Sequence, residues 1–123
     1  MRVILTLLLL LSVTPAWADW AKVSEEDGIA FFIDPSTVRK FGNLRRVGGL
    51  QDLTQNGFDG ALSRRTLEEY DCVEMKTRIV SFSDHSGQMG SGEILRWFKQ
   101  PVAWAYISPG TRAAAILAIV CAR

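Results

Sequence analysis

Residues 63–82, SRRTLEEYDCVEMKTRIVSF, form the longest stretch of the chain that suits a β-strand. Tyr70 and Cys72 alternate with acidic residues, and Val73, Met75 and Ile79 then take the other phase. Because successive strand side chains point to opposite faces, this alternation predicts a strand with one wet face. The change of phase after Cys72 predicts a β-bulge at that point.

Shorter strands are expected before this stretch. Segments 20–23 and 29–33 flank an Asp-Gly pair at 27–28, which is typical of a hairpin turn because glycine tolerates positive φ. The second strand should end at Pro35, which fixes φ and lacks a backbone donor, with one helical turn over 37–40. A turn at 42–43 then leads into a strand over 44–53, where two adjacent glycines predict a bulge or a close crossing.

The C-terminal part is predicted to end in a helix. Residues 84–92 (DHSGQMGSG) read as a flexible connection, and 94–98 and 104–107 as short strands. The SPGT segment at 108–111 predicts a helix start with Ser108 or Thr111 as the capping residue. The alanine-rich segment 112–120 favours a helix whose broad apolar face must be buried. The sum is an antiparallel sheet with one helix packed on it, an α+β fold.

The N-terminal residues have the pattern of a secretory signal peptide. Arg2 precedes an apolar run over 3–11 (VILTLLLLL), and Ala16 and Ala18 supply the small residues of a cleavage site before Asp19. The apolar run is too short to cross a bilayer of ~30 Å, which takes about 20 residues. We therefore expect residues 1–18 to be removed and 19–123 to form one exported domain with no stable membrane span. The alternative is a retained N-terminal anchor.

The cysteine count is consistent with export. Cys72 and Cys121 are the two cysteines of the chain, and in an oxidising compartment one disulfide is the economical assignment. Two cysteines and one histidine fall short of a four-ligand metal site, so no metal or other cofactor is expected. A catalytic thiol is disfavoured, because no Cys-x-x-Cys motif is present.

No catalytic constellation is predicted. His85 is the single histidine, and its setting in the 84–92 segment favours a solvated loop residue. The glycine-rich run 87–92 lacks the lysine of a phosphate-binding loop. The carboxylate pairs at 25–26 and 68–69 diverge rather than converge on a cleft. The tryptophans and phenylalanines are expected mainly in the core.

The charge balance argues against a nucleic-acid partner. Loss of Arg2 with the leader leaves thirteen basic against thirteen acidic residues, whereas a nucleic-acid-binding domain usually carries a basic surplus. Basic pairs such as those at 45–46 and 64–65 are read as solvated strand faces.

An ordered set of segments along the whole expected mature chain resembles the surface-adhesin protein E-like domain family of bacterial exported proteins. The segments that carry this resemblance are Trp20, Gly28, FIDPST at 32–37, Asn43 with 44–52, Ser63-Arg64, EYDC at 69–72, SPGT at 108–111 and VC at 120–121. The resemblance implies about six antiparallel strands, a C-terminal helix and a disulfide matching Cys72–Cys121.

The resemblance also implies a function. The adhesin that names the family is a surface-exposed lipoprotein that binds host matrix and serum proteins such as laminin, vitronectin and plasminogen, and no enzymatic activity is implied. In this chain Ala18-Asp19 stands where a lipoprotein needs a cysteine. We therefore expect a non-catalytic binding protein, exported to the cell surface or the periplasm. The alternatives are a soluble periplasmic protein that assists envelope assembly or inhibits an enzyme, and a small hydrolase that uses His85.

Overall fold

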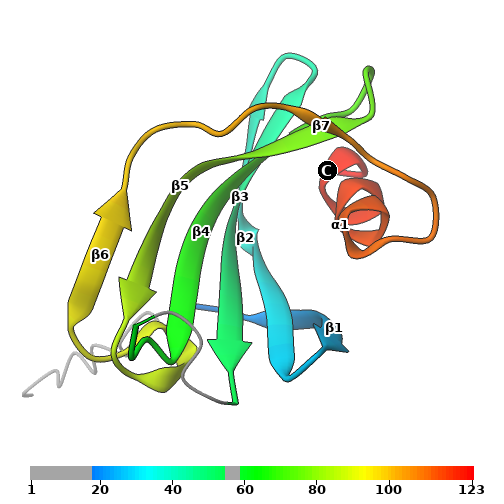
Figure 1. The fold of residues 1–123 in the computed structure, drawn as a ribbon. Coiled ribbons are helices and arrows are strands. Elements are labelled where there is room, and N and C mark those ends of the chain that lie inside the picture. Colours follow the sequence, from blue (N-terminus) through cyan, green and yellow to red (C-terminus); the bar gives the residue numbers. More distant parts are fainter. Residues whose placement is uncertain (1–17, 55–58) are drawn as a thin grey trace, which may run out of the picture.

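The computed structural model describes residues 18–54 and 59–123 (Figure 1). The predicted leader therefore lies outside the described residues, except for Ala18. Within the described ranges the chain forms seven strands, a short 3₁₀ turn η1 and one α-helix. In order, these are β1 (Ala21–Glu26), β2 (Ile29–Phe41), β3 (Leu44–Leu53), β4 (Ser63–Asp71), β5 (Lys76–His85), η1 (Gln88–Gly90), β6 (Ile94–Phe98), β7 (Ala105–Tyr106) and α1 (Arg112–Cys121).

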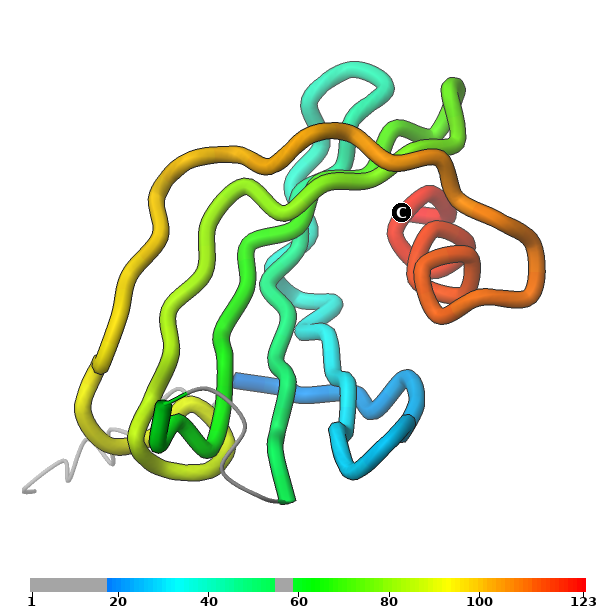
Figure 2. The backbone as a smooth tube through the Cα atoms, in the orientation of Figure 1, coloured from blue at the N-terminus to red at the C-terminus, as the bar shows by residue number. Residues whose placement is uncertain are grey.

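The strands build a single antiparallel meander. β1 to β6 lie side by side in sequence order, and β7 pairs with the first residues of β5. The sheet is strongly curved, and α1 lies on its concave side after a long connection that runs over the sheet (Figures 1 and 2). The predicted α+β class, sheet and C-terminal helix are confirmed.

The hydrophobic core lies between the helix and the concave face. Three buried sheet residues meet three buried helix residues there: Ile33, Val47 and Tyr70 against Ile116, Leu117 and Val120. Burial of each large apolar side chain contributes roughly 1.5–3 kcal/mol. This contact positions α1 so that its first turn overlooks the middle of the sheet.

The helix begins where the sequence predicts. Thr111 is the N-cap, and its hydroxyl accepts a hydrogen bond from the amide of Ala114 at 3.3 Å. Of the two predicted caps, Ser108 instead offers its carbonyl to the Thr111 hydroxyl at 2.7 Å. The helix has ten residues, and no helix in the described part of the chain is long and apolar enough to span a bilayer.

The prediction of one long strand with a bulge at Cys72 is wrong. Residues 72–75 form a tight turn between β4 and β5. The side chain of Asp71 accepts hydrogen bonds from the amides of Val73 and Glu74 at 3.0 and 2.9 Å, and Met75 adopts a positive φ of 56°. A carboxylate that bonds the next amides stabilises a turn in place of an extended chain. The register shift in this strand pair falls between Leu67 and Glu68 instead.

The expected end of the second strand at Pro35 is also wrong. β2 continues to Phe41, with a register shift between Asp34 and Arg39 that accommodates the proline. The hydroxyl of Thr37 bridges the irregularity: it accepts from the amide of Gly48 at 2.8 Å and donates to the carbonyl of Asp34 at 2.7 Å. A side chain thus replaces the missing ladder bond, and no helical turn forms over 37–40.

The predicted hairpin turns and the close approach at the glycine pair are confirmed. Asp27 and Gly28 have φ values of 50° and 77°, the double positive φ of a two-residue hairpin turn. At Gly49 an added Cβ would lie 1.9 Å from the Glu68 carboxylate and 2.4 Å from the Thr66 hydroxyl. Glycine at this position therefore makes room for the Glu68 side chain on the concave face.

The predicted disulfide is present. Cys72, in the β4–β5 turn, bonds Cys121 at the end of α1, with the two Cα atoms 5.8 Å apart. The bond fastens the last turn of the helix to the sheet.

Candidate functional site

The two outer edges of the sheet differ in character. β1 forms one edge, and its exposed side chains are charged: Lys22 pairs with Glu25, and Glu26 pairs with Arg112 of α1 at 2.9 Å. Charged side chains on an edge strand disfavour the addition of another strand. The β1 edge is therefore poorly suited to recruiting a partner.

β6 forms the other edge, and it is apolar. Four of its five side chains are exposed hydrophobic groups, with Trp97 59 % and Phe98 55 % exposed beside Ile94 and Leu95. We refer to Ile94, Leu95, Trp97 and Phe98 as the apolar edge. Among the described residues, no strand pairs with the outer side of β6. Exposed apolar patches of this kind mark interaction sites.

The apolar edge was missed by the sequence reasoning. Aromatic residues were expected mainly in the core, and for Trp97 and Phe98 that expectation is wrong. Phe98 stacks on Phe82 of β5 with ring centroids 5.2 Å apart, and Lys99 lies 4.0 Å from the centre of the Trp97 ring. These contacts hold the two rings in place at the surface.

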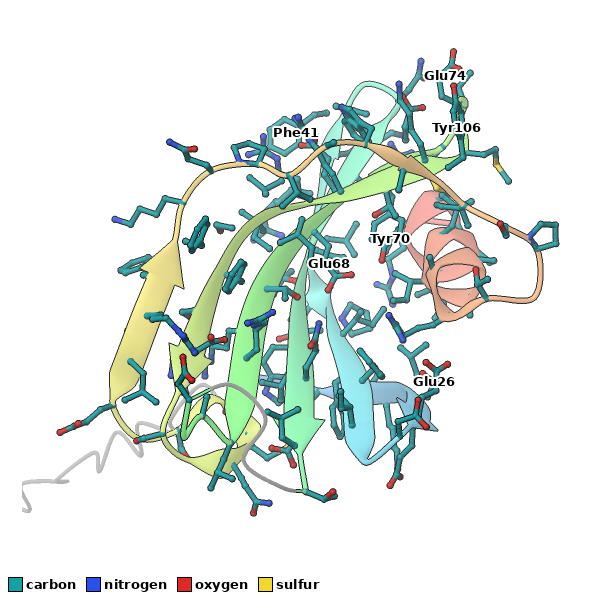
Figure 3. All side chains as sticks on the ribbon, viewed as in Figure 1. Glu26, Phe41, Glu68, Tyr70, Glu74 and Tyr106 are labelled. Atoms are coloured by element: carbon teal, nitrogen blue, oxygen red, sulfur yellow. A yellow bond between two sulfur atoms is a disulfide. The ribbon has the colours of Figure 1, made fainter. Side chains whose placement is uncertain are left out.

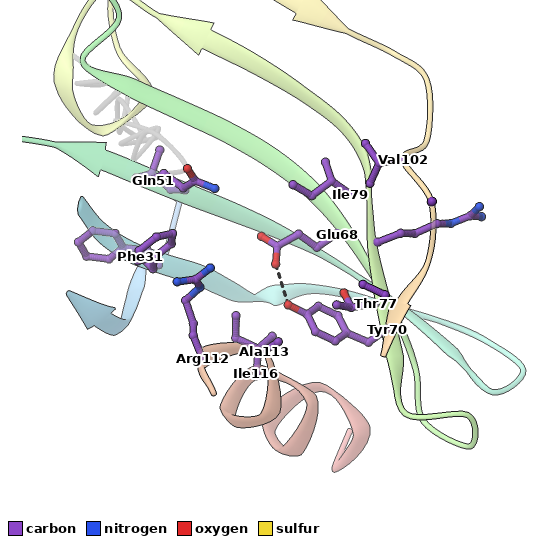
Figure 4. A pocket seen from close by; sticks show the side chains of 15 residues that line it. Phe31, Gln51, Glu68, Tyr70, Thr77, Ile79, Val102, Arg112, Ala113 and Ile116 are labelled. Carbon is purple, nitrogen blue, oxygen red and sulfur yellow. Dashed lines mark hydrogen bonds between the residues drawn. The ribbon is translucent and has the colours of Figure 1, made fainter. Parts of the chain in front are cut away.

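A second candidate site is a pocket on the concave face, between the sheet and the start of α1 (Figure 4). Its volume is about 240 Å³, and aliphatic and aromatic side chains make up most of its wall. Three charged side chains, Glu68, Arg78 and Arg112, also line it. Figure 3 shows Glu68 and Tyr70 in the space between the curved sheet and the helix.

The Glu68 carboxylate is held by two hydroxyl groups. Thr66 donates to Oε2 at 2.6 Å, and Tyr70 donates to Oε1 at 2.7 Å (Figure 4). Burial, together with the charge and the hydrogen bond of Glu68, raises the pKa of the Tyr70 hydroxyl well above its usual 10.0. Tyr70 therefore stays protonated and keeps donating to Glu68.

Arg112 closes one end of this pocket. Its guanidinium lies 3.5 Å from the centre of the Phe31 ring and donates to Glu26 at 2.9 Å. The cation is thus already paired with a carboxylate and stacked on an aromatic face, an arrangement that suits a guanidinium.

On the convex face, a buried carboxylate joins three strands. Glu69 of β4 is 1 % exposed and accepts from Arg46 of β3 at 2.6 Å and from Arg78 of β5 at 2.9 Å. Burial opposes ionisation of Glu69, but the hydrogen bonds and charges of the two arginines outweigh it and lower its pKa below the usual 4.5. This cluster is fully paired and stabilises the sheet.

His85 is not the solvated loop residue that the sequence suggested. It ends β5 and is 6 % exposed, and its Nε2 lies 2.7 Å from the hydroxyl of Ser83. Its Nδ1 is buried and has no partner among the described residues, so no carboxylate orients the ring as a Ser-His-Asp triad requires. Asp84 points to the opposite face and pairs with Arg64.

The buried histidine should make stability fall in mild acid. Burial first, and then the charge of Arg65, lowers the pKa of His85 below 6.5, while Asp84 offsets this only in part. Below pH 6.5 the unfolded chain binds a proton that the folded protein resists, so the free energy of unfolding should fall with pH at up to about 1.4 kcal/mol per unit until the folded pKa is reached.

Urea unfolding at pH 7.5 and 5.5 checks this expectation for the natural protein and for His85→Gln. The variant should lose less stability between the two pH values. Equal losses in both proteins would assign the pH dependence to other groups.

Among the predicted site residues, the structure joins Cys72 to Cys121, as described. Asp19 lies beside the sheet, and its amide donates to the carboxylate of Asp34 at 3.2 Å. Cleavage between Ala18 and Asp19 stays a prediction. No cluster of three or more potential metal-ligating side chains occurs within residues 18–54 and 59–123.

Comparison with known proteins decides the family. Residues 20–122 match the family described as surface-adhesin protein E. The chain belongs to this family. The resemblance found along the sequence is thereby confirmed, and no sequence among the curated proteins matches significantly.

Solved structures of protein E share the fold of this surface-adhesin protein E family member. Protein E of Haemophilus influenzae superposes with a TM-score of 0.70 at 15 % identity, over 87 % of this chain and 86 % of that one. Protein E from non-typeable Haemophilus influenzae gives a TM-score of 0.64 at 15 % identity, over 89 % and 79 %. A second crystal form of Haemophilus influenzae protein E gives 0.62 at 16 % identity, over 81 % and 91 %.

Proposed function

We propose that this chain is an exported, non-catalytic binding protein that displays the apolar edge of β6 to a host matrix or serum protein. Membership of a surface-adhesin family supports a binding role at the cell surface. The single observation that carries the proposed site is the exposure of four apolar side chains on an edge strand.

The chemistry of an edge strand suits this role. The outer side of β6 carries backbone N–H and C=O groups to which an extended segment of another protein can hydrogen-bond as an added strand. The apolar side chains of β6 would pack against side chains of that segment and contribute most of the affinity, since exposed aromatics are the usual anchors of an interface. The charged β1 edge offers no comparable surface.

Loss of the indole at the apolar edge should weaken binding. Trp97→Ser is expected to lower affinity for the bound matrix or serum protein by about tenfold or more, because a central aromatic anchor is typically worth about 2 kcal/mol or more. Binding of the exported protein to immobilised laminin, vitronectin and plasminogen measures the effect.

Tyr106→Ser is the matched control, since Tyr106 is an 81 % exposed aromatic residue on β7, away from β6. It should leave binding unchanged. Equal binding by the Trp97 variant and the natural protein would show that β6 is not the contact surface.

The second candidate function is that of a soluble periplasmic protein with an envelope partner, which the Ala18-Asp19 cleavage site favours because it offers no cysteine for a lipid anchor. Protease treatment of intact cells, beside a periplasmic extract, separates the two locations. Loss of the protein from intact cells supports surface display. Full protection, with release into the periplasmic extract, would overturn the adhesin role.

A further inference from the structure

The concave pocket holds a carboxylate that the fold leaves without a cation. The ion pairs of the described residues connect other acidic groups, and Glu68 takes part in none of them. Its two oxygens each accept one hydroxyl donor, whereas a carboxylate offers about four acceptor positions. Acceptor capacity and negative charge therefore remain directed at the pocket.

The surroundings of Glu68 are built to present it. Thr66 and Tyr70, its two donors, are 7 % and 2 % exposed, so the hydroxyls that fix the carboxylate are themselves held by packing. Glycine at position 49 supplies the space in which the carboxylate sits. A rigid, singly hydrogen-bonded carboxylate at the wall of a cavity is a preorganised site for a cationic group.

An apolar track leads away from this carboxylate. Ile79 of β5 lies directly opposite Glu68 in the strand register, and the amide of Val102 bonds the carbonyl of Ile79 at 3.0 Å. Glu68, Ile79 and Val102 thus lie on three adjacent segments and line the same pocket (Figure 4). A chain of methylene groups can lie along Ile79 and Val102 while its charged end reaches Glu68.

We propose that this pocket binds a primary ammonium group carried on an extended alkyl chain, with Glu68 as the counter-ion and Ile79 and Val102 as the contacts of the chain. The volume of about 240 Å³ is smaller than the ~300–1,000 Å³ of pockets for drug-sized ligands and suits one side chain or a small diamine. The source of the ammonium is a lysine side chain of a protein or a free alkylamine.

A primary ammonium fits better than a guanidinium. A guanidinium pairs with both oxygens of a carboxylate at once, and here each oxygen is already occupied by a hydroxyl donor. An ammonium is a point charge that needs one acceptor position. A quaternary ammonium would seek an aromatic face, but the Phe31 ring is covered by Arg112.

Calorimetric titration of the exported protein tests the proposal with four probes. Cadaverine represents the free amine, and a short peptide with one lysine represents the protein source. The same peptide with norleucine removes the ammonium, and with arginine it replaces the ammonium by a guanidinium. We expect one of the first two probes to bind, with the norleucine and arginine peptides weaker by about tenfold or more. Binding of cadaverine alone would assign a free amine, and binding of the lysine peptide a protein side chain.

Two variants connect that binding to the pocket. Glu68→Gln should weaken it by about tenfold or more, since a hydrogen bond to a charged group is lost, whereas Glu93→Gln, at an exposed site outside the pocket, should not change it. Val102→Ser tests the track independently of Glu68: Val102 is exposed, so the fold should tolerate the change, and cadaverine should lose affinity while methylamine does not.

The proposal is overturned if neither cadaverine nor the lysine peptide binds, or if both Glu68→Gln and Val102→Ser leave binding unchanged. Melting temperatures of the variants, compared with the natural protein, show whether a loss of binding reflects a loss of fold. The test does not involve the apolar edge, so its outcome is independent of the proposed adhesin function.

Discussion

Replacement of both Cys72 and Cys121 by serine is expected to lower the free energy of unfolding by about 4 kcal/mol. The disulfide closes a loop with a sequence separation of 49 residues, and its loss returns that conformational freedom to the unfolded chain. For a domain of this size about 4 kcal/mol is a large part of the total stability and lowers the melting temperature by roughly 20 °C.

Thermal and urea unfolding of the double variant and of the natural protein measure this effect. The natural protein with added reductant is the matched control, and it should approach the stability of the variant. A melting temperature that is the same in all three samples would contradict the structural role. Digestion without reductant should also yield one peptide pair that contains Cys72 and Cys121.

Glu69→Gln is expected to cost about 2–3 kcal/mol. The buried carboxylate is the shared acceptor of Arg46 and Arg78, and a neutral amide turns an NH₂ donor toward one of these cations. Breaking a buried ion pair typically costs about 3–5 kcal/mol. The expected value is lower because Arg46 and Arg78 are 39 % and 26 % exposed and can turn to water.

Urea unfolding at pH 7 checks the size of this effect. Glu25→Gln is the control, because its ion pair with Lys22 is exposed on both sides and such pairs are worth about 0–1 kcal/mol. The lowered pKa of Glu69 contributes stability above pH 4.5 that is lost as the pH falls through the folded pKa, so the natural protein should lose this advantage over Glu69→Gln in acid. Equal stabilities at pH 7 would contradict the prediction.

The parts of the fold that the sequence predicts are those with local causes. Asp27-Gly28 makes a hairpin turn because both residues take positive φ, and Thr111 caps α1 because its side chain reaches the amide three residues on. The pairing of Cys72 with Cys121 follows from their number and from export. Each of these features depends on a few neighbouring residues or on a count.

The features that the sequence reasoning missed depend on contacts between distant segments. Thr37 keeps β2 extended past a proline only because Gly48 of β3 donates to it. The turn after Asp71 competes with a strand reading of the same residues, and alternation alone does not separate the two. Glu68 had been paired with Glu69 as solvated surface, but the curvature of the sheet places the first in a pocket and the second under two arginines.

The disulfide also determines how the protein responds to a protease. β5, β6, β7 and α1 all lie between Cys72 and Cys121 in the sequence, together with the connections that join them. A single cut anywhere between these two cysteines therefore leaves both pieces in one covalent molecule, and the strand with the apolar edge stays attached to the rest of the sheet. For an exported protein exposed to proteases, a nick in a surface connection becomes a repairable opening of the backbone rather than the loss of a fragment.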